Sequence, residues 1–382
     1  MKTLELFSGA GGLALGLEKS GYSCIGLLEK DKNACNTLRK NFSAEVFEND
    51  IQHFSYKNIK SKVELVAGGP PCQPFSLGGK AKGKADKRDM FPEASRAIAE
   101  LNPKGFIFEN VKGLLRDSFS TYLEYIILRL SYPFESIKNE ESWIDHLSRL
   151  EKIKSSATAV SGQYQVLFRC LNAADYGVPQ RRERVFIVGL RKDLGVEWSF
   201  PEPTHSADSL AYAKFVTEEY WQTTNATPSD DDFAKIKDGT LKKSLINRFG
   251  LFEPRHLPWQ TVRQALKGLP EPNEQGSKKY KAHILKDGAK SYPGHTGSPL
   301  DDPSKALKAG VHGVPGGENT LRRNDGSVRY FTVREAARIQ TFPDDFEFSG
   351  AWSENMRQLG NAVPVELGQT IGLSLSNALK YI

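Results

Sequence analysis

The sequence predicts an α/β protein built on a mostly parallel sheet with helices on both faces. Three observations predict this fold. Short apolar runs typical of buried strands alternate with helix-like segments through the first 190 residues. A glycine-rich turn, Gly9-x-Gly11-x-x-Ala14, follows the first run, as in nucleotide-binding folds. A stiff turn at residues 68–71 ends another run and presents Cys72.

The expected elements follow one another in regular order. The expected strands are residues 4–7, 24–28, 46–47, 63–67, 105–108, 165–171 and 185–190, and the expected helices are 13–18, 31–41, 92–101 and most of 112–163. Residues 132–162 are polar and mixed, and we interpret them as an insertion. The chain of 382 residues with 39% hydrophobic residues is long enough for one large domain and a smaller one.

Composition narrows the possible partners and compartment. A formal charge of +6 permits nucleic acid as a partner without demonstrating it. Four scattered cysteines and histidines without ligand spacing predict no metal and no disulfide framework, which is typical of a reducing, cytoplasmic compartment. The N-terminus has no signal-peptide pattern, and no apolar run approaches the roughly 20 residues that span a bilayer.

Chemically useful side chains come at the ends of the expected strands, where open α/β sheets bind ligands. Glu29 lies 20 positions after Gly9, the position of an acid that binds ribose hydroxyls. Cys72 is a candidate nucleophile, although a lone cysteine is more often a buried, inert residue. Asp50 and Glu109 end two further strands. Each of these acids alone could be a solvated turn residue. The placement of such side chains at several strand ends favours a ligand-binding or catalytic site.

Two basic segments lie beside these strand ends. Residues 77–89 are rich in glycine and lysine, which predicts a loop beside Cys72 that contacts phosphates and closes on the substrate rather than a merely solvated one. In the run 180–184, strand alternation puts Arg182 and Arg184 on one face, which favours two guanidinium groups aimed at one place over a surface patch.

Six motifs in order give the chain a family resemblance. They are FSGAGG (7–12), GPPCQPFS (69–76), ENV (109–111), QRRER (180–184), RYFTVREAAR (329–338) and QLGNAVP (358–364). With them the chain resembles the cytosine-C5 DNA methyltransferases of bacterial restriction–modification systems. The resemblance implies a sheet of the S-adenosylmethionine-dependent methyltransferase type and a site-specific DNA (cytosine-5-)-methyltransferase that protects DNA.

The resemblance also implies the chemistry. The Cys72 thiolate adds to C6 of a cytosine flipped out of the duplex, and C5 then takes the methyl group of S-adenosylmethionine, leaving S-adenosylhomocysteine. Glu109 would contact N3 and the exocyclic amine, Arg184 would hold O2, and Arg182 would support the site. The sequence does not identify the base that removes the C5 proton.

By the same resemblance, two further groups of residues bind cofactor and substrate. The cofactor residues would be Phe7, Gly9, Ala10, Gly11, Gly12, Glu29, Lys30, Asp50, Ile51, Pro71, Asn361 and Val363. The DNA-contacting residues would be Gln73, Ser76, Lys80, Lys82, Arg88, His295 and His312. Lys30 departs from the apolar or aromatic residue common in the family, and we expect its stem to cover the adenine with its amine in water.

The family places a target-recognition domain between its arginine motif and its threonine–arginine motif. We therefore expect a catalytic domain at 1–190, to which 328–382 returns, and an irregular recognition domain at 191–327. Within the latter we expect a loop at 223–232 and a helix at 259–269. Thr332 and Glu335 form a capping box, and a final helix covers 365–379. We expect a monomer that binds double-stranded DNA and does not associate with a membrane. A cognate restriction endonuclease would not need to bind the protein.

Three alternatives remain open from the sequence. A tRNA methyltransferase of the same family is disfavoured by the long 191–327 segment, since that branch is generally compact there. A catalytically idle DNA-binding regulator is disfavoured by Cys72, Glu109 and Arg184. A nicotinamide oxidoreductase is suggested by the glycine turn alone.

Overall fold

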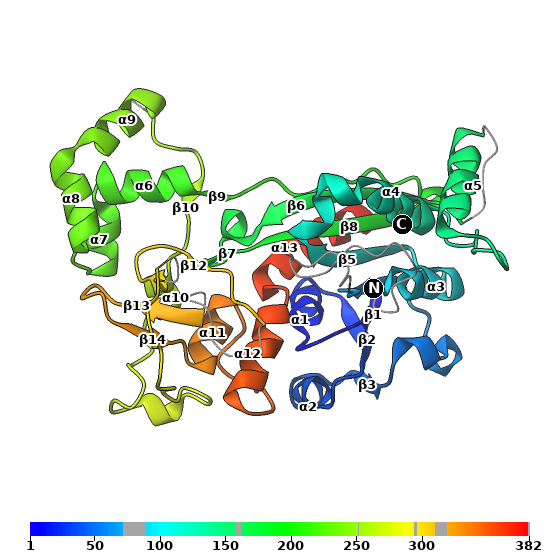
Figure 1. The fold of residues 1–382 in the computed structure, drawn as a ribbon, viewed down its shortest axis with the longest axis horizontal. Coiled ribbons are helices and arrows are strands. Elements are labelled where there is room, and N and C mark those ends of the chain that lie inside the picture. Colours follow the sequence, from blue (N-terminus) through cyan, green and yellow to red (C-terminus); the bar gives the residue numbers. More distant parts are fainter. Residues whose placement is uncertain (72–88, 157–161, 251, 294–295, 310–318, 381–382) are drawn as a thin grey trace. The chain divides into compact units, whose positions relative to one another are not determined.

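A seven-stranded sheet is the main element of the first part of the chain (Figure 1). The computed structural model describes residues 1–71, 89–156, 162–250, 252–293, 296–309 and 319–380. The strand order is β3-β2-β1-β4-β5-β8-β6. The strands are β1 (Lys2–Leu6), β2 (Ser23–Glu29), β3 (Glu45–Glu48), β4 (Leu65–Gly68), β5 (Gly105–Val111), β6 (Tyr164–Asn172) and β8 (Glu183–Arg191). All seven expected strands are present.

The direction of the strands fixes where a ligand can sit. The pairs β2–β3, β1–β2, β1–β4 and β4–β5 are parallel, whereas β8 runs antiparallel to β5. The chain fills one side of β1 with β2 and β3 and then crosses to the other side with β4 and β5. The carboxyl ends of β1 and β4 therefore flank a topological switch point, the usual ligand crevice of open α/β sheets.

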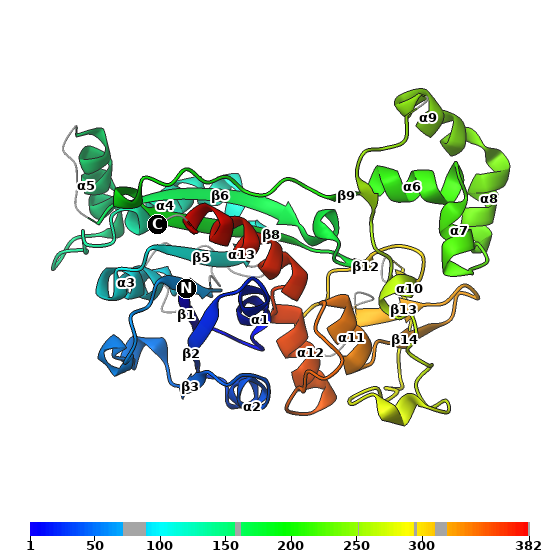
Figure 2. The ribbon, with the colours of Figure 1, turned by 180° about the vertical axis from the view of Figure 1, so that it is seen from behind.

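Helices cover both faces of this sheet. They are α1 (Gly12–Lys19), α2 (Lys32–Asn41), α3 (Phe91–Leu101), α4 (Ser120–Ser131) and the later part of α13 (Val365–Leu379), whereas α5 (Trp143–Ser155) packs on α4. Figure 1 shows α4 on one face, and the view from behind in Figure 2 brings α13 in front of the sheet. The expected insertion at 132–162 thus contains a helix of its own, α5, which begins with a capping box at Ser142 and Asp145.

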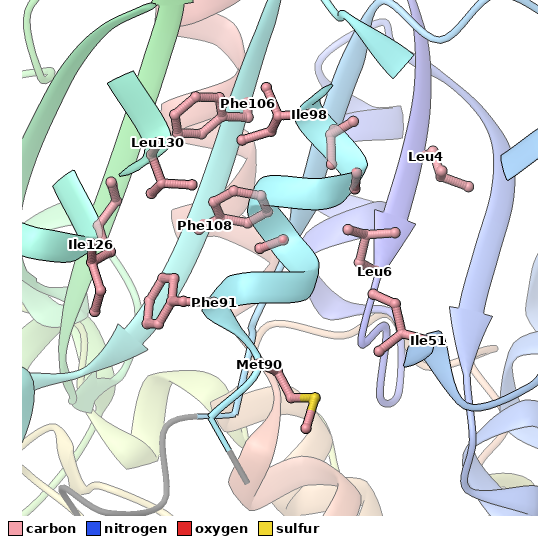
Figure 3. Close-up of a cluster of buried hydrophobic side chains, with 14 of the residues drawn as sticks. Leu4, Leu6, Ile51, Met90, Phe91, Ile98, Phe106, Phe108, Ile126 and Leu130 are labelled. Atoms are coloured by element: carbon pink, nitrogen blue, oxygen red, sulfur yellow. The ribbon is translucent and has the colours of Figure 1, made fainter. Parts of the chain in front are cut away.

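Alternation along β1 divides its side chains between the two faces. Leu4 and Leu6 join the large cluster that contains Phe106 and Phe108 of β5 and side chains of α3 and α4 (Figure 3). Glu5 points to the other face, where it meets the backbone of α1 at Ala14, and burial raises its pKa well above the usual value. This face is closed by α13, since Ser20 donates a hydrogen bond to the Gln369 carbonyl.

The chain divides into two compact units that are described separately. Unit 1 comprises Met1–Leu171, Glu183–Phe200 and Gly368–Ile382, and unit 2 comprises Asn172–Arg182 and Pro201–Leu367. Residues 328–367, which we expected to return to the catalytic domain, belong to unit 2. The expected return of the last helix to the first half starts only at Gly368, within α13.

Unit 2 is more helical than its sequence suggests. Its helices are α6 (Ala207–Phe215), α7 (Glu219–Thr224), α8 (Asp230–Asp238), α9 (Thr240–Phe249), α10 (Val262–Ala265), α11 (Val333–Ile339) and α12 (Trp352–Asn361). Its small sheets pair β7 (Gln180–Arg181) with β12 (Ser304–Lys305), β9 (His205–Ser206) with β10 (Leu257–Pro258), and β11 (Ser298–Pro299) with β13 (Thr320–Arg322) and β14 (Val328–Tyr330).

Three local predictions in unit 2 can be compared with these elements. The loop expected at 223–232 is shorter, at 225–229, because α7 reaches Thr224 and Ser229 caps α8 by accepting a hydrogen bond from the Asp232 N–H. The helix expected at 259–269 is shorter, because Thr261 caps it and Leu266 already ends it. The capping box of Thr332 and Glu335 is confirmed in both directions. No helix in the described part of the chain is long and apolar enough to cross a membrane.

Candidate active site

The glycine-rich turn after β1 opens one side of the switch point. Phe7, Gly9 and Gly11 have positive φ angles of 54°, 53° and 79°. Gly11 is necessary, because a Cβ there would lie 2.6 Å from the Phe42 ring. A Cβ at Gly9 would meet nothing within 4 Å, so there is open space in front of the turn. The backbone can therefore be approached closely by a ligand.

The Glu29 carboxylate is fixed beside this turn. Its Oε2 accepts a hydrogen bond of 2.8 Å from the Gly9 N–H. Its Oε1 accepts bonds of 2.8 Å from the N–H groups of both Lys30 and Asp31. Three N–H donors hold the carboxylate in one orientation, and each oxygen accepts through two lone pairs. The arrangement suits an acid that must be preorganised for hydroxyl groups.

The turn after β3 completes this half of the site. Asp50 caps the short 3-10 turn Ile51–His53, since its Oδ1 accepts a 3.1 Å bond from the Gln52 N–H. Its Oδ2 lies 3.7 Å from the Lys30 amine, and both side chains are substantially exposed. Ile51 is 4% exposed. The Lys30 amine thus has a carboxylate partner, where we expected it only in water.

The carboxyl end of β4 brings the chain to the candidate nucleophile. Cys72, Gln73, Ser76, Lys80, Lys82 and Arg88, and most of the expected loop at 77–89, lie outside the described residues. The chain on either side of this segment is fixed. The Pro71 carbonyl accepts a 3.1 Å bond from the Met90 N–H, and the Pro70 carbonyl accepts a 2.9 Å bond from the Asn110 side chain. The described residues just before and just after this segment are therefore close together, joined by the Met90–Pro71 hydrogen bond.

Glu109 and Arg184 meet beside the chain that leads into this segment. Glu109 lies near the end of β5, and Arg184 is the second residue of β8, opposite Val111. The Arg184 Nε lies 2.7 Å from the Glu109 Oε1, and the two side chains are 16% and 10% exposed. A Cβ on Gly69 would lie 3.3 Å from the other oxygen of Glu109. A partly buried carboxylate and guanidinium therefore stand directly beside the chain that leads to Cys72.

The remaining site residues occupy other places. Ala10 is buried within the turn, Gly12 begins α1 and Pro71 is exposed. Arg182 belongs to unit 2, where its Nη1 and Nη2 donate bonds of 3.1 and 2.7 Å to the carbonyls of Leu307 and Gly360. The two predicted guanidinium groups thus have different partners. Asn361, which is exposed, and Val363, which is buried, also belong to unit 2. His295 and His312 lie outside the described residues.

Three contributing residues were not predicted. Asn110 lies within a quoted motif, and its adjacency to Glu109 was a usable signal for its bond to Pro70. Asp89 and Tyr122 form a hydrogen bond at the end of the segment that begins with Cys72. Nothing in the local sequence around Tyr122 indicates this contact. Among the described residues no cluster of histidine, cysteine, aspartate and glutamate could hold a metal ion.

The sheet order and the two strand-end turns define the class of protein. The structure superposes on the crystal structure of S. pombe Dnmt2 methyltransferase with a TM-score of 0.58, 18% identity and coverage of 100% of this chain and 99% of that chain. A Spodoptera frugiperda DNMT2 mutant gives a TM-score of 0.54, 18% identity and coverage of 96% and 97%. The fold is that of the S-adenosylmethionine-dependent methyltransferases.

Sequence comparison defines the family. The family model described as C-5 cytosine-specific DNA methylase matches residues 1–132 and 144–377. The Type II methyltransferase M.PspPI of Psychrobacter sp. is 34% identical over 98% of this chain and 79% of its own length. The Type II methyltransferase M.NgoMIV of Neisseria gonorrhoeae is 31% identical over 99% of this chain and 98% of its own. The chain belongs to the C-5 cytosine-specific DNA methylase family and is a DNA (cytosine-5-)-methyltransferase.

Proposed function

We propose that Cys72 is the nucleophile of this enzyme and that Glu109 and Arg184 hold the target cytosine. The observation that carries the proposal is the 2.7 Å contact of Arg184 with Glu109, beside the chain that enters Cys72. The protonated carboxyl group can donate a hydrogen bond to N3, and its other oxygen can accept one from the exocyclic amine. The guanidinium can donate to O2. Both groups stabilise charge that builds on the ring during attack.

The steps of the reaction in which Cys72 would take part follow from the position of Glu109 and Arg184. The Cys72 sulfur, as thiolate, would form a bond to C6, and the electron pair displaced from the C5–C6 double bond would make C5 nucleophilic toward the methyl group that S-adenosylmethionine would supply, leaving S-adenosylhomocysteine. A base then removes the C5 proton, the ring recovers its double bond, and the sulfur leaves. An ordinary thiol is only partly ionised near neutral pH, so the surroundings must favour the thiolate. The target base must leave the duplex to meet the sulfur, at a cost of a few kcal/mol.

We propose further that Phe7, Gly9, Gly11, Glu29 and the turn at Asp50 hold S-adenosylmethionine. That cofactor supplies an electrophilic methyl group when bound. The residues fit it in two respects. The turn has open space at Gly9, and the Glu29 carboxylate is preorganised by three N–H donors. Ala10, Gly12, Lys30, Ile51 and Pro71 belong to unit 1, and Asn361 and Val363, which the family resemblance also assigns to the cofactor, belong to unit 2.

The proposed substrate is double-stranded DNA with one short target sequence. The Type II methyltransferase names of the relatives favour protection of DNA beside a restriction endonuclease. We propose unit 2 as the larger part of the target-recognition domain, with His295 and His312 among its DNA contacts and Gln73, Ser76, Lys80, Lys82 and Arg88 contributing from the segment after Cys72. We expect a monomer. Expression in a methylation-free host, followed by base-resolution mapping of 5-methylcytosine, identifies the DNA sequence that the enzyme recognises. Methyl incorporation into tRNA instead of plasmid DNA would contradict the proposed DNA substrate.

The test of the nucleophile uses DNA that carries 5-fluorocytosine at the target. Fluorine cannot leave as the proton does, so the covalent adduct accumulates in the presence of S-adenosylmethionine. The wild type should give an adduct stable on a denaturing gel, and Cys72→Ser should give none. Cys170→Ser is the matched control, because Cys170 is a free, partly exposed cysteine on β6. An adduct in Cys72→Ser would refute the assignment.

A further inference from the structure

Arg96, on the second turn of α3, makes an unusual set of contacts outside its own helix. Its Nη2 donates a 2.6 Å bond to the Ile51 carbonyl, and its Nη1 donates a 3.3 Å bond to the Phe54 carbonyl. The same guanidinium lies 4.9 Å from the centre of the Tyr56 ring. One side chain therefore donates hydrogen bonds to the first residue of the 3-10 turn Ile51–His53 and to the residue that follows the turn.

The orientation of this guanidinium is set by its own helix. Its Nε lies 2.7 Å from Glu93, one turn earlier, and its Nη1 lies 2.9 Å from Glu100, one turn later. The planar fork can satisfy several acceptors at once in a fixed geometry, which a lysine amine cannot do. Glu93 and Glu100 thus aim the remaining donors at the two carbonyls.

The turn that Arg96 holds is part of the proposed donor pocket. Asp50 caps it, and Ile51 is its first residue. It follows β3, the outermost strand on that side of the sheet, so only one neighbouring strand supports the chain there. A charge-assisted hydrogen bond to the Ile51 carbonyl adds a constraint from the adjacent helix.

The same helix is tied to the other half of the site. Met90, which precedes α3, donates its N–H to the Pro71 carbonyl at 3.1 Å. The Gln52 side chain in turn donates to the Met90 sulfur at 3.8 Å. The base of α3 therefore connects the end of β4, just before Cys72, with the turn at residues 50–54.

We propose that Arg96 is a positioning residue for the methyl donor. It holds the Asp50–Ile51 backbone at the place where the adenosine part of the donor binds, without touching the donor or the reacting atoms. The inference rests on the proposed function, because it assumes that this turn forms part of the donor pocket.

The test measures binding of S-adenosylhomocysteine by calorimetry, so its readout does not depend on turnover. Arg96→Ala should weaken binding about tenfold, and Arg96→Lys, which keeps the charge but loses the fork, about threefold. With saturating donor and DNA, kcat should stay within about twofold of wild type while KM for the donor rises. A merely structural role would not separate KM from kcat in this way.

Arg149→Ala is the matched control. Arg149 on α5 has the same bonding pattern, with Glu141 at 2.8 Å, Glu135 at 2.9 Å and the Ser136 carbonyl at 2.8 Å. It should lower thermal stability by a similar amount and leave donor binding unchanged. Equal binding by Arg96→Ala and wild type, or equal loss in Arg149→Ala, would overturn the inference. A wild type that does not bind S-adenosylhomocysteine would overturn the proposed donor pocket instead. If Arg96→Ala does not fold, Arg96→Lys decides between these results.

Discussion

The Arg184 guanidinium lies against the Glu109 carboxylate, with Nε 2.7 Å from Oε1, and joins two strands that run in opposite directions. The pair depends on the register of β5 and β8, in which Val111 stands opposite Arg184. Both side chains are mostly buried, so neither charge is strongly screened by water. Each therefore holds the other in the position that the proposed mechanism requires before any substrate arrives.

The first prediction concerns this pair. Glu109→Gln should slow methyl transfer about 10²- to 10³-fold, about 2.7–4 kcal/mol, because it removes charge stabilisation in the transition state. Single-turnover transfer from labelled donor to DNA measures the rate. Glu183→Gln is the control, since Glu183 lies next to Arg184 and pairs with Lys112 at the exposed surface. A Glu109→Gln rate within twofold of wild type would show that the carboxylate does not act on the base.

The second prediction concerns Gly68, the last residue of β4. Its φ is +153°, and a Cβ there would lie 2.1 Å from the Leu6 carbonyl oxygen of β1. Gly68→Ala must push the two strands apart, and we expect a loss of at least about 2 kcal/mol of unfolding free energy, from backbone strain together with the clash.

Gly21→Ala separates the clash from the strain. Gly21 also has a positive φ, of +86°, but a Cβ there would meet nothing within 4 Å. We expect it to cost only about 1 kcal/mol, the strain of the left-handed conformation. Urea unfolding of both variants measures the difference, and equal losses would show that the strands can separate easily at Gly68.

The third prediction concerns a buried cation in unit 2. The Lys214 amine is 3.2 Å from the Asp232 carboxylate and from the Asp301 carbonyl, and its side chain is 4% exposed. Lys214→Met should lower the unfolding free energy by about 3 kcal/mol, because it leaves Asp232 buried without its main partner. Lys235, 54% exposed and 3.6 Å from the same carboxylate, is the control. Lys235→Met should cost about 0–1 kcal/mol, as exposed pairs do. Similar urea midpoints for both variants would contradict this account.

The fourth prediction concerns pH and the packing of α5 on α4. His146 is fully buried, its Nε2 donates to the Glu135 carbonyl, and its Nδ1 accepts from the Tyr125 hydroxyl. Burial lowers its pKa below 6.5, and the nearby cations Arg149 and Arg129 act in the same direction, while Glu141 opposes them. As the pH falls through 6.5, His146 therefore takes up a proton in the unfolded chain before it does so in the folded chain. This contribution to stability is complete above pH 6.5 and is lost as the pH falls below it.

His146→Gln should remove the loss of stability that His146 causes at low pH. We expect the wild type to lose more stability than His146→Gln between pH 7.5 and pH 5.5, measured by urea unfolding at each pH. His53→Gln is the control, since His53 is exposed and the variant should keep the wild-type pH dependence. A wild-type and a His146→Gln protein with the same pH dependence would show that His146 takes up its proton equally in the folded and the unfolded chain.

The sequence predicts the catalytic half of the fold better than the other half. Apolar runs mark β4, β5 and β8 most clearly, because a strand buried between two layers of helices must be largely apolar along its length. The helices at 207–249 are short and amphipathic only in part, so they carry a weak periodic signal. Tertiary contacts stabilise them instead, as where Tyr220 donates to Asp301 and Trp221 donates to the Lys214 carbonyl.

The sequence by itself determined where the strands occur along the chain, the glycine turn and the polar residues at the strand ends, because each depends on neighbours a few positions away. Only the tertiary structure decided which of these residues meet. Strand alternation placed Arg182 and Arg184 together, yet Arg182 bonds to two carbonyls in unit 2 and Arg184 pairs with Glu109. Arg96 reaches Ile51 from another helix. Such contacts depend on strand register and helix placement, which local patterns of hydrophobicity do not encode.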